Sequence, residues 1–376
     1  MKLVITQSNL TLKGGAEAVL LKIAQRYKAK IYTAEYDPKG TFEGFRDLDV
    51  EVIGRSGLYR VLPYSRMAQG LNYGLSFLNL KLKEDYDVIN PHMAPSHWVR
   101  KNNPRVVWYC HTPLRDVYDL YDFRLSLKKF YARPVYRIGA YNVRKIDRSV
   151  VKDIEFIFAN SRNTKSRVKR YLDRDSEVLG GGIDYRRYSD DGDGKYFLYP
   201  SRFSPNKRQE YALKAFEMFK RMKKGYRLLL VGPVSKDRFY YDYYQRIADE
   251  AKAIGDVKII TEADTDALIG LYSKATAVLY TPINEDYGLV PLEAMASGKP
   301  IISVNEGGPK ETIMDGSTGF LVNSAREMAE RMRHVAEHPK LSEQMGRRGA
   351  ERVRKNYSWD RFFARFDQVL RKVKQM

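Results

Sequence analysis

The segment 277–296 reads AVLYTPINEDYGLVPLEAMA, and it combines an apolar run, a polar loop and the start of a short helix. The run Ala277–Tyr280 predicts a buried strand, and Pro291 with Gly298 would bracket the helix. Pro291 suits the first helical position, because its φ is already helical and its missing N–H would have no partner there. The segment therefore predicts one strand–helix unit of an α/β protein.

The same segment places two carboxylates around a helix start. Glu285 would lie in the loop, and Glu293 would lie in the first helical turn. The amides of Gly288, Leu289 and Val290 would have no helical acceptors, and such a helix end favours an anionic group such as phosphate. We interpret the pattern as a site for a ligand with both hydroxyls and phosphates, such as a sugar nucleotide. The alternative is structural, since a glutamate near a helix start is stabilising by itself.

Short apolar runs alternate with helical patterns along most of the chain, which predicts parallel sheets covered by helices on both faces. The expected strands are Leu3–Ile5, Ile31–Thr33, Val50–Ile53, Val88–Asn90, Val106–Cys110, Phe156–Ala159, Tyr196–Tyr199, Arg227–Val231, Val257–Ile260, Ala277–Tyr280 and Pro300–Val304. The expected helices include Ala16–Tyr27, Gln209–Lys223, Phe239–Ala253, Asp264–Lys274 and Ala325–Glu337. Two such sets predict two Rossmann-like, doubly wound domains that face a central cleft.

The polar, glycine-rich stretch 180–194 is the best linker candidate in the chain. We therefore place the first domain at residues 1–185 and the second at residues 190–357. The tail 358–376 opens with Ser358, which suits a helix N-cap. Apolar residues recur in it at helical spacing, so we expect this helix to pack back on the first domain. These residues are Phe362, Phe363, Phe366, Val369, Leu370 and Val373.

Composition excludes several classes of protein. The chain has 376 residues and one cysteine, Cys110, so neither an internal disulfide nor a cysteine-rich metal framework can form. No His/Cys/Asp cluster has metal-ligand spacing. The first residues lack the pattern of a signal peptide, and no uncharged apolar run approaches the ~20 residues that span a bilayer. We expect a cytoplasmic protein without a bound metal.

Positive charge is concentrated in one part of the chain. The net charge is +20, and residues 124–174 hold fifteen Lys/Arg against four Asp/Glu, with interleaved aromatics at Phe130, Tyr131, Tyr136 and Tyr141. No nucleic-acid-binding motif is present, so we do not expect nucleic acid as a partner. An anionic surface at the inner face of the cell membrane is the favoured partner, and an anionic substrate or a solvated basic face are the alternatives. The candidate contacts to membrane or acceptor are Arg115, Lys128, Lys129 and Arg133.

Other candidate residues follow expected strands. Gly14 and Gly15 precede a helix, where glycine lets a ligand approach the backbone and helix-end amides. Arg202 and Lys207 flank a loop after the strand 196–199, and their charge could stabilise a departing diphosphate. His111 ends the strand 106–110 and could bind a sugar hydroxyl or lie near the reacting carbon, with His92 a weaker candidate. Each of these residues also has an ordinary structural explanation.

Taken together, these motifs resemble glycosyltransferase family 4, whose members are retaining enzymes with the two-domain GT-B fold. Glu285 and Glu293 resemble the family's E-x7-E motif, and the segment from Arg202 to Lys207 resembles its R-x4-K signature. Residues 14–17 resemble its N-terminal glycine loop. Further matches are Ala159-Asn160-Ser161, Gly182-Ile183-Asp184, Gly307-Gly308-Pro309 with Glu311, Asp315-Gly316-Ser317-Thr318-Gly319 and Tyr357-Ser358-Trp359.

Two segments look most like the mannosyltransferases that extend lipid-linked or polysaccharide-repeat glycans. They are Tyr109–Arg115, YCHTPLR, and Glu285–Gly288, EDYG. The chain departs from those relatives at 180–182, where three glycines stand in place of a proline-rich turn. The resemblance to the mannosyltransferases is therefore weaker than the resemblance to the family.

The resemblance implies a hexosyltransferase that takes its sugar, with mannose favoured, from a GDP- or UDP-linked donor without a metal. Arg202 and Lys207 would neutralise the departing diphosphate, and the amides of 288–290 and of Gly15 would add hydrogen bonds to it. Glu293 would bind the ribose. Glu285 would bind hydroxyls of the donor sugar, and His111 would lie beside the anomeric carbon.

Two alternatives remain open at this point. The fold also occurs in nucleotide-sugar epimerases and α-glucan phosphorylases. A basic binding protein without catalysis could use it as well.

Overall fold

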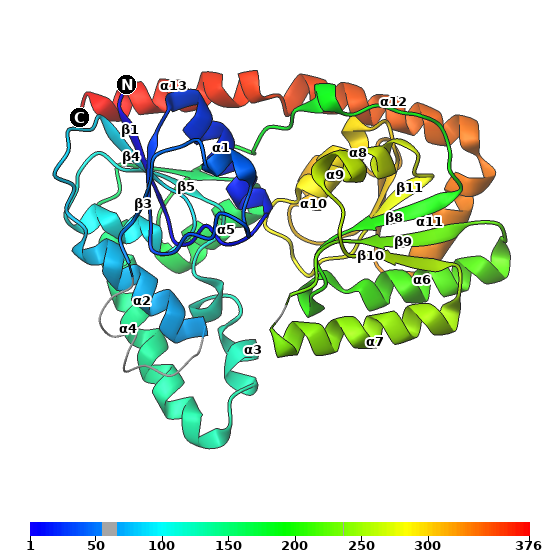
Figure 1. The fold of residues 1–376 in the computed structure, drawn as a ribbon, viewed down its shortest axis with the longest axis horizontal. Helices are drawn as coiled ribbons and strands as arrows, with labels where there is room; N and C mark the ends of the chain where they lie inside the picture. The colour runs from blue at the N-terminus through cyan, green and yellow to red at the C-terminus, as the bar shows by residue number, and fades with distance from the viewer. Residues whose placement is uncertain (55–65, 236) are drawn as a thin grey trace. The chain divides into compact units, whose positions relative to one another are not determined.

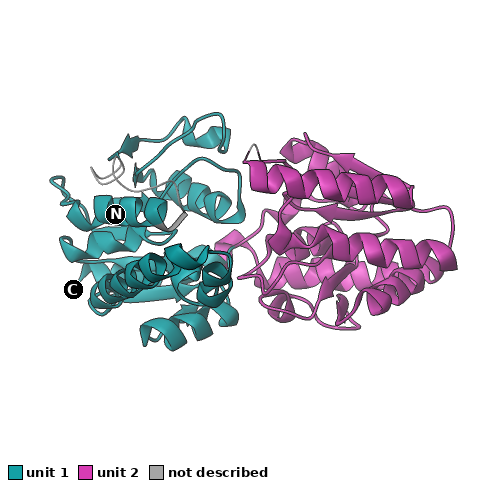
Figure 2. Cartoon of the chain, turned by 90° about the horizontal axis from the view of Figure 1, so that it is seen from below, with its two compact units in different colours: residues 1–181, 362–376 teal, residues 182–361 magenta. Residues whose placement is uncertain are grey.

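The computed structural model describes residues 1–54, 66–235 and 237–376, and the chain divides into two compact units. Unit 1 comprises residues 1–181 and 362–376, and unit 2 comprises residues 182–361 (Figure 2). In each unit, parallel strands alternate with helices that cover both faces of the sheet (Figure 1). The predicted α/β class, with a doubly wound parallel sheet in each half of the chain, is confirmed.

The described strands of unit 1 are ordered β3-β2-β1-β4 and β5-β6-β7. A parallel bridge between Ile89 and Val106, with a 2.9 Å hydrogen bond from the Ile89 amide to the Arg105 carbonyl, joins these two groups. The strands are β1 (Leu3–Gln7), β2 (Lys30–Thr33), β3 (Val50–Val52), β4 (Val88–Pro91), β5 (Val107–Cys110), β6 (Phe156–Ala159) and β7 (Glu177–Val178). The connection reverses direction between β1 and β4, so polar residues after these strands can reach one crevice.

The helices of unit 1 cover a core that includes Trp98 and Trp108, both fully buried. They are α1 (Gly15–Tyr27), α2 (Arg66–Asn79), α3 (Tyr121–Ser126), α4 (Arg133–Val151), α5 (Arg162–Leu172) and α13 (Trp359–Lys374), of which α13 belongs to unit 1 from Phe362 onward. The start of α5 is fixed by Ser161, whose hydroxyl accepts a 3.0 Å hydrogen bond from the Thr164 amide.

Unit 2 repeats the arrangement, and its described strands are ordered β10-β9-β8-β11-β12-β13. These strands are β8 (Tyr196–Pro200), β9 (Arg227–Val231), β10 (Val257–Ile260), β11 (Ala277–Tyr280), β12 (Ile301–Val304) and β13 (Gly319–Val322). Its helices are α6 (Gln209–Met222), α7 (Arg238–Ile254), α8 (Thr265–Ser273), α9 (Leu289–Ala296), α10 (Pro309–Thr312), α11 (Ala325–Glu337) and α12 (Pro339–Asn356). The order reverses between β8 and β11, so the loops after these two strands meet at one edge of the sheet.

Alternation along β8 explains why both faces of this sheet are covered. Phe197 and Tyr199 are buried in a cluster with residues of α6 and α11. Tyr196 and Leu198 are buried in a second cluster with residues of α9. Successive strand residues point to opposite faces, so an almost wholly apolar strand needs helices on both sides.

The helix α13 buries all six apolar residues that the sequence identified in it. Phe362 packs on Tyr109 with ring centroids 5.7 Å apart, and Phe366 packs on Phe158 at 5.8 Å. The Ser358 hydroxyl accepts a 3.3 Å hydrogen bond from the Arg361 amide, as an N-cap does. The two ring contacts attach the last helix to the sheet of unit 1.

Two short strands escaped sequence analysis. Strand β7 has two residues, and β13 begins at Gly319, within a segment that the sequence marked as a glycine-containing turn. Both are too short or too close to a turn to show an apolar pattern of their own. The three glycines at 180–182 have a packing reason at one position, because a Cβ on Gly182 would overlap the ring and backbone of Trp359.

Candidate functional site

Two loops at the reversal point of unit 2 bring Lys207 to Glu285. Lys207 ends a 3₁₀ turn, Pro205–Lys207, that follows β8, and Glu285 lies in the loop after β11. The Lys207 ammonium forms an ion pair with Oε2 of Glu285. Their side chains are 15% and 21% exposed, so the pair is largely shielded but can still be reached by a ligand. The structural alternative for Lys207, a solvated charge in a loop, therefore does not hold.

The loop that carries Glu285 is held by the glycine pair Gly307-Gly308. Gly307 has φ +61°, and a Cβ there would overlap the backbone of Glu285. The Gly308 amide donates a 2.8 Å hydrogen bond to the Glu285 carbonyl, and a Cβ on Gly308 would overlap the backbone of Tyr287. The backbones of the two segments therefore approach more closely than any side chain would allow.

Arg208 and Glu306 tie the same loops together, and sequence analysis missed both. The Arg208 guanidinium donates to the Thr281 carbonyl at 2.6 Å and pairs with Glu306 at 2.9 Å. The other carboxylate oxygen of Glu306 accepts a 3.1 Å hydrogen bond from the Asn284 amide. Their positions could have indicated them, because each is adjacent to a motif residue: Arg208 follows Lys207, and Glu306 precedes Gly307-Gly308.

Helix α9 begins two residues earlier relative to its proline than the sequence suggested. Gly288 is the N-cap with φ +84°, and Leu289 and Val290 are the first two helical residues. Pro291 is therefore third rather than first, and Glu293 lies in the second turn rather than the first; both expectations were wrong. The reason is that all of the first four N–H groups of a helix lack acceptors, so proline fits the third position as well.

Glu293 is partly buried beneath the helix start. It accepts a 2.6 Å hydrogen bond from the hydroxyl of Tyr272, a fully buried side chain of α8. Burial raises the pKa of Glu293, and the hydrogen bond from Tyr272 opposes that shift only in part. Buried Tyr280 contacts the same region: its ring would lie 3.2 Å from a Cβ on Gly288, and burial together with the charge of Glu285 raises its pKa.

Arg202 differs from Lys207, although both flank the same turn. Its side chain is exposed, and it has no ion-pair partner among the described residues of the chain. Its carbonyl accepts a 2.9 Å hydrogen bond from the side chain of Gln209, which fixes the backbone at the start of α6. The anchored backbone and the unpaired guanidinium leave Arg202 able to turn toward an anionic ligand.

His111 of unit 1 is 7% exposed and belongs to a buried chain of polar side chains. Its Nε2 lies 2.9 Å from Nδ1 of His92, and Nε2 of His92 lies 2.9 Å from Oδ1 of Asn90. Burial lowers the pKa of His111 to about 3, and burial together with His111 lowers that of His92 well below 6.5. Both rings are therefore neutral at physiological pH, and His92 contacts His111 directly.

The glycine loop of unit 1 leads into α1, with Gly14 as its N-cap and Gly15 as its first residue. A Cβ on Gly14 would overlap the carboxylate of Glu17, which is buried and receives a 3.3 Å hydrogen bond from Gln7. A side chain at position 14 would therefore have to displace the carboxylate of Glu17. The Gly15 amide at the helix start is one of the groups suited to an anion.

Comparison with known proteins identifies the family of this chain. Residues 13–187 match the family described as Glycosyltransferase Family 4, and residues 184–352 match Glycosyl transferases group 1. The α-1,3/1,6-mannosyltransferase ALG2 of Mus musculus is 30% identical over 96% of this chain and 94% of its own. The chain belongs to glycosyltransferase family 4. It is a hexosyltransferase that moves a sugar from a nucleotide sugar to an acceptor.

Two further proteins are similar to this chain. Trehalose synthase of Pyrococcus horikoshii is 28% identical over 70% of this chain and 63% of its own. The crystal structure of Anabaena HepE in complex with UDP and glucose has a TM-score of 0.76 and 17% identity, and it covers 98% of this chain and 99% of HepE. This last comparison establishes that the two share the GT-B fold.

The basic stretch 124–174 of this family 4 enzyme does not form one face. Tyr136 is buried, contrary to expectation, and its hydroxyl donates to the Asp116 carbonyl. Arg167 is 6% exposed, and the Arg174 guanidinium donates to carbonyls at the end of α4. Arg167 and Arg174, in the second half of the stretch, therefore belong to the fold rather than to an exposed basic face.

The first half of the stretch is different, because apolar side chains are exposed there. On α3, on the turn after it and on the first half of α4, seven large apolar residues are 55–81% exposed. We call them the apolar tip: Phe123, Leu127, Phe130, Tyr131, Val135, Ile138 and Tyr141. Exposed cations accompany them at Lys129, Arg133 and Arg137.

The other predicted contacts of this region are engaged in local interactions. Arg115 forms an ion pair with Asp119 at 2.9 Å, and the Lys128 ammonium lies 5.7 Å from the ring centroid of Tyr136. Arg133 donates a 3.2 Å hydrogen bond to the Lys128 carbonyl and remains exposed. None of the described helices is long and apolar enough to cross a membrane.

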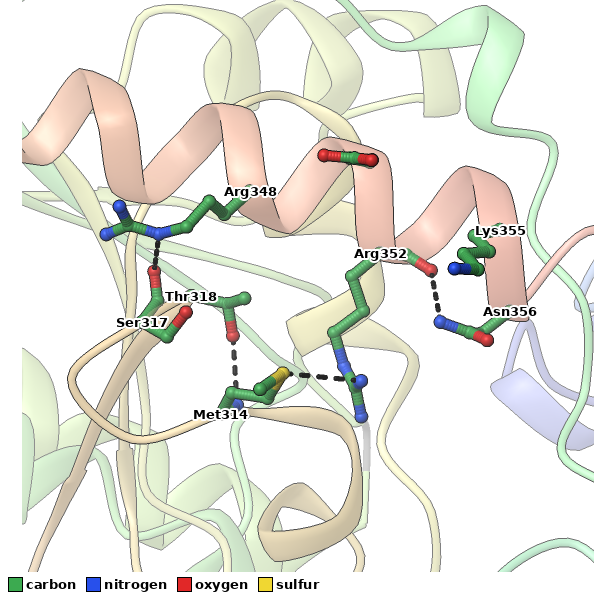
Figure 3. Close-up of a pocket in the computed structure, with 8 residues that line it drawn as sticks. Met314, Ser317, Thr318, Arg348, Arg352, Lys355 and Asn356 are labelled. Atoms are coloured by element: carbon green, nitrogen blue, oxygen red, sulfur yellow. Dashed lines mark hydrogen bonds between the residues drawn. The ribbon is translucent and has the colours of Figure 1, made fainter.

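A pocket of about 250 Å³ lies between α12 and the turn before β13 (Figure 3). The Arg352 guanidinium donates to the carbonyls of Glu311 and Thr312, and Arg348 donates to that of Ser317. Because Arg348 and Arg352 are used to hold the turn, this pocket is a weaker candidate for a ligand site than the loops that carry Lys207 and Glu285. Among the described residues, no group of three His, Cys, Asp or Glu side chains could hold a metal ion.

Proposed function

We propose that this enzyme is a retaining, metal-independent glycosyltransferase that transfers mannose from a nucleotide diphosphate sugar to a glycan or lipid-linked acceptor. The observation that carries the proposal is the ion pair of Lys207 and Glu285 beside the N-terminus of α9. It combines, at one edge of a parallel sheet, a cation for phosphate, a carboxylate for hydroxyls and amides for an anion. Similarity over almost the full length to the ALG2 mannosyltransferases favours mannose.

Unit 2 would bind most of the donor, and unit 1 would bind most of the acceptor. Lys207 and Arg202 stabilise the negative charge that develops on the departing diphosphate. Glu285 accepts hydrogen bonds from the donor sugar, Glu293 accepts them from the ribose, and His111 contacts the sugar near its anomeric carbon. Each carboxylate is partly shielded from water, which strengthens a hydrogen bond to a bound hydroxyl.

The diphosphate also needs hydrogen-bond donors, and the amides of 288–290 and of Gly15 supply them. Two cations and oriented amides provide the charge stabilisation that a divalent ion gives in other transferases. The acceptor hydroxyl attacks from the face that the diphosphate leaves, and the departing phosphate oxygen takes its proton. The new glycosidic bond then has the configuration of the bond that was broken.

The first test identifies the donor by thermal shift with GDP-, UDP- and ADP-linked sugars, since a ligand that binds only the folded state raises apparent stability. The stabilising donor is then incubated with a mannosylated glycan acceptor, with and without EDTA. We expect an α-linked product at an unchanged rate in EDTA. A β-linked product, loss of transfer in EDTA, or stabilisation by none of the donors would contradict the proposal.

We propose further that the apolar tip docks unit 1 on an anionic membrane that carries the acceptor. Phe130 is 81% exposed and Ile138 is 64% exposed, and they belong to a set of seven exposed apolar side chains. A single exposed apolar residue is ordinary on a protein surface, whereas a patch of them marks an interaction site. Lys129, Arg133 and Arg137 are exposed beside them and match anionic headgroups. Apolar insertion and surface charge would act together.

The docking surface has an internal anchor. Asp147, in the second half of α4, is buried and accepts hydrogen bonds from Trp98 at 2.7 Å and from Tyr118 at 2.9 Å. His97 contacts the same carboxylate at 2.8 Å. The second half of α4 is therefore fixed to the core of unit 1, while its first half presents the exposed residues.

Co-sedimentation with vesicles tests the docking. We expect binding to anionic vesicles and not to neutral ones, with loss of binding at high salt. The double variant Phe130→Ser/Ile138→Ser should lose most of the binding. The matched control is Phe239→Ser, which removes a 59% exposed phenylalanine from α7 of unit 2 and should bind as the wild type does. Equal loss in the control, or equal binding to both vesicle types, would contradict docking through the apolar tip.

A further inference from the structure

The strands β4 and β5 of unit 1 carry a hydrogen-bonded chain of side chains that ends at His111. The Asn90 amide nitrogen donates to the Val107 carbonyl at 2.6 Å, and Asn90 Oδ1 contacts His92 Nε2 at 2.9 Å. His92 Nδ1 then contacts His111 Nε2 at 2.9 Å. Asn90 and His92 are fully buried, so no water competes for these contacts.

The proton positions in this chain follow from one fixed acceptor. The Val107 carbonyl can only accept, so the Asn90 amide must direct its nitrogen to Val107 and its oxygen to His92. An amide oxygen also only accepts, so His92 carries its proton on Nε2. Because the buried ring of His92 is neutral, its Nδ1 has a lone pair and must receive a proton from its neighbour.

His111 is the neighbour that donates. Its Nε2 must carry the proton, since His92 Nδ1 offers only a lone pair at 2.9 Å. Burial keeps the pKa of His111 low, at about 3, so its second nitrogen stays unprotonated. This Nδ1 has no hydrogen-bond partner in the part of the chain that the structure describes, and it is the ring nitrogen left for a ligand.

We propose that Asn90 and His92 are positioning residues that hold His111 as the Nε2–H tautomer, so that its Nδ1 accepts a hydrogen bond from a hydroxyl of the donor sugar. The inference rests on the proposed function, which places the donor sugar at His111. A neutral acceptor fixes the direction of that hydroxyl's proton. It also puts no positive charge beside an anomeric carbon that itself becomes positive as the leaving group departs.

Neighbouring groups hold the two rings in place. The Trp108 indole donates a 3.1 Å hydrogen bond to the carbonyl of His92. The Tyr109 ring packs edge-on against His111 at 5.0 Å and lies 5.5 Å from the ring of His92. The two histidines are therefore held by a hydrogen bond to the backbone of His92 and by contact with the ring of Tyr109.

The first test reads the tautomer directly and needs no activity. Nitrogen-15 NMR of the full chain, labelled in its five histidines, shows which ring nitrogen bears a proton. Assignment uses His92→Asn and His111→Ala. We expect a proton on Nε2 and none on Nδ1 for both His92 and His111. A proton on Nδ1 of His111 would overturn the inference whatever the enzyme catalyses.

The second test separates positioning from folding. Asn90→Leu has nearly the same shape but removes the acceptor, so His92 can adopt either tautomer. We expect kcat to fall roughly two- to tenfold, the range of one neutral hydrogen bond, with unchanged affinity for the free nucleoside diphosphate. The single variant His92→Asn places an amide oxygen near the former Nδ1. It should therefore retain most of the wild-type rate and keep the proton on Nε2 of His111.

The outcomes distinguish this inference from the proposed function. If His111→Ala keeps the wild-type rate, the proposed contact of His111 with the sugar is wrong, while the NMR result still decides the tautomer. If His111→Ala is impaired but Asn90→Leu is not, the contact stands and the positioning by Asn90 is wrong. Weaker nucleoside diphosphate binding in Asn90→Leu would indicate general damage and would also count against positioning.

Discussion

The ammonium of Lys207 is paired with the carboxylate of Glu285, 78 positions further along the chain. Each charge is largely shielded from water, and each neutralises the other. A bound diphosphate would compete for Lys207, and sugar hydroxyls would compete for Glu285. Under the proposed function, donor binding exchanges one internal ion pair for contacts to two parts of the ligand, which favours a donor that supplies both parts.

Removal of either partner of this pair should impair transfer. Lys207→Ala loses a contact to the leaving group and leaves Glu285 without its cation. Glu285→Ala loses a contact to the donor sugar. We expect at least about a tenfold fall in kcat for each, the scale of one charge-stabilising contact. Steady-state kinetics at saturating donor would measure the effect.

The matched control for these variants is Arg221→Ala. It breaks the pair between Arg221 and Glu217 on α6, whose side chains are 75% and 47% exposed. Exposed pairs contribute little, so its kinetics and stability should remain close to those of the wild type. Near wild-type turnover in a folded Lys207→Ala variant would rule out the role of Lys207 at the leaving group.

Glu293→Gln should stabilise the ligand-free protein while weakening donor binding. The folded-state pKa of Glu293 is raised, so between its unfolded and folded values the native state binds more protons than the unfolded chain. Stability then falls as pH rises through that window. Glutamine has no charge to bury and still accepts from Tyr272. We expect a higher Tm than the wild type above the window and no difference at pH values below it.

Thermal melts between pH 4 and 8 would measure this difference, and titration with donor would measure the loss of binding. Glu330→Gln on the exposed face of α11 is the control, since Glu330 is 50% exposed in its pair with Arg326. It should show no comparable pH-dependent gain. A Tm of Glu293→Gln below that of the wild type at every pH would contradict the cost of burying this charge.

The sequence predicted the strands best where a run was apolar throughout. Strand β11 lies at Ala277–Tyr280 as expected, because a strand buried on both faces needs no alternation. Helix α9 was found, but its start was misplaced, since proline fits any of the first helical positions. The motif residues Glu285 and Lys207 could be named, but their ion pair could not, because it depends on the meeting of two loops. The hydrogen bonds that link the side chains of Asn90, His92 and His111 were missed for the same reason.

Gly307→Ala should damage the site through the backbone. The substitution meets a positive φ of +61° and an overlap with the backbone of Glu285. Gly316→Ala is the matched control, since Gly316 has φ +70° but no atom within 4 Å of its Cβ. Both variants carry the strain of the left-handed conformation, on the order of 1 kcal/mol. Only Gly307→Ala must also displace the loop.

The difference between the two glycine variants isolates that displacement. We expect kcat/KM of Gly307→Ala to be at least about tenfold below that of Gly316→Ala, because a shift of about 1 Å in a positioning group can cost that much or more. Both should show a lowered Tm in thermal melts. Equal kcat/KM in the two variants would mean that the Glu285 loop tolerates the shift.

The attachment of α13 can be tested at Phe366, which is fully buried in unit 1. Its ring packs on Phe158 at 5.8 Å and on Tyr27 at 6.1 Å, so Phe366→Ala should lower the free energy of unfolding of unit 1 by about 3–5 kcal/mol. Urea unfolding followed by tryptophan fluorescence would measure the loss, since Trp98 and Trp108 are both buried in unit 1. Arg371→Ala, on the exposed side of the same helix, should change stability by less than about 0.5 kcal/mol. Equal effects of the two variants would mean that the buried face of α13 does not stabilise unit 1.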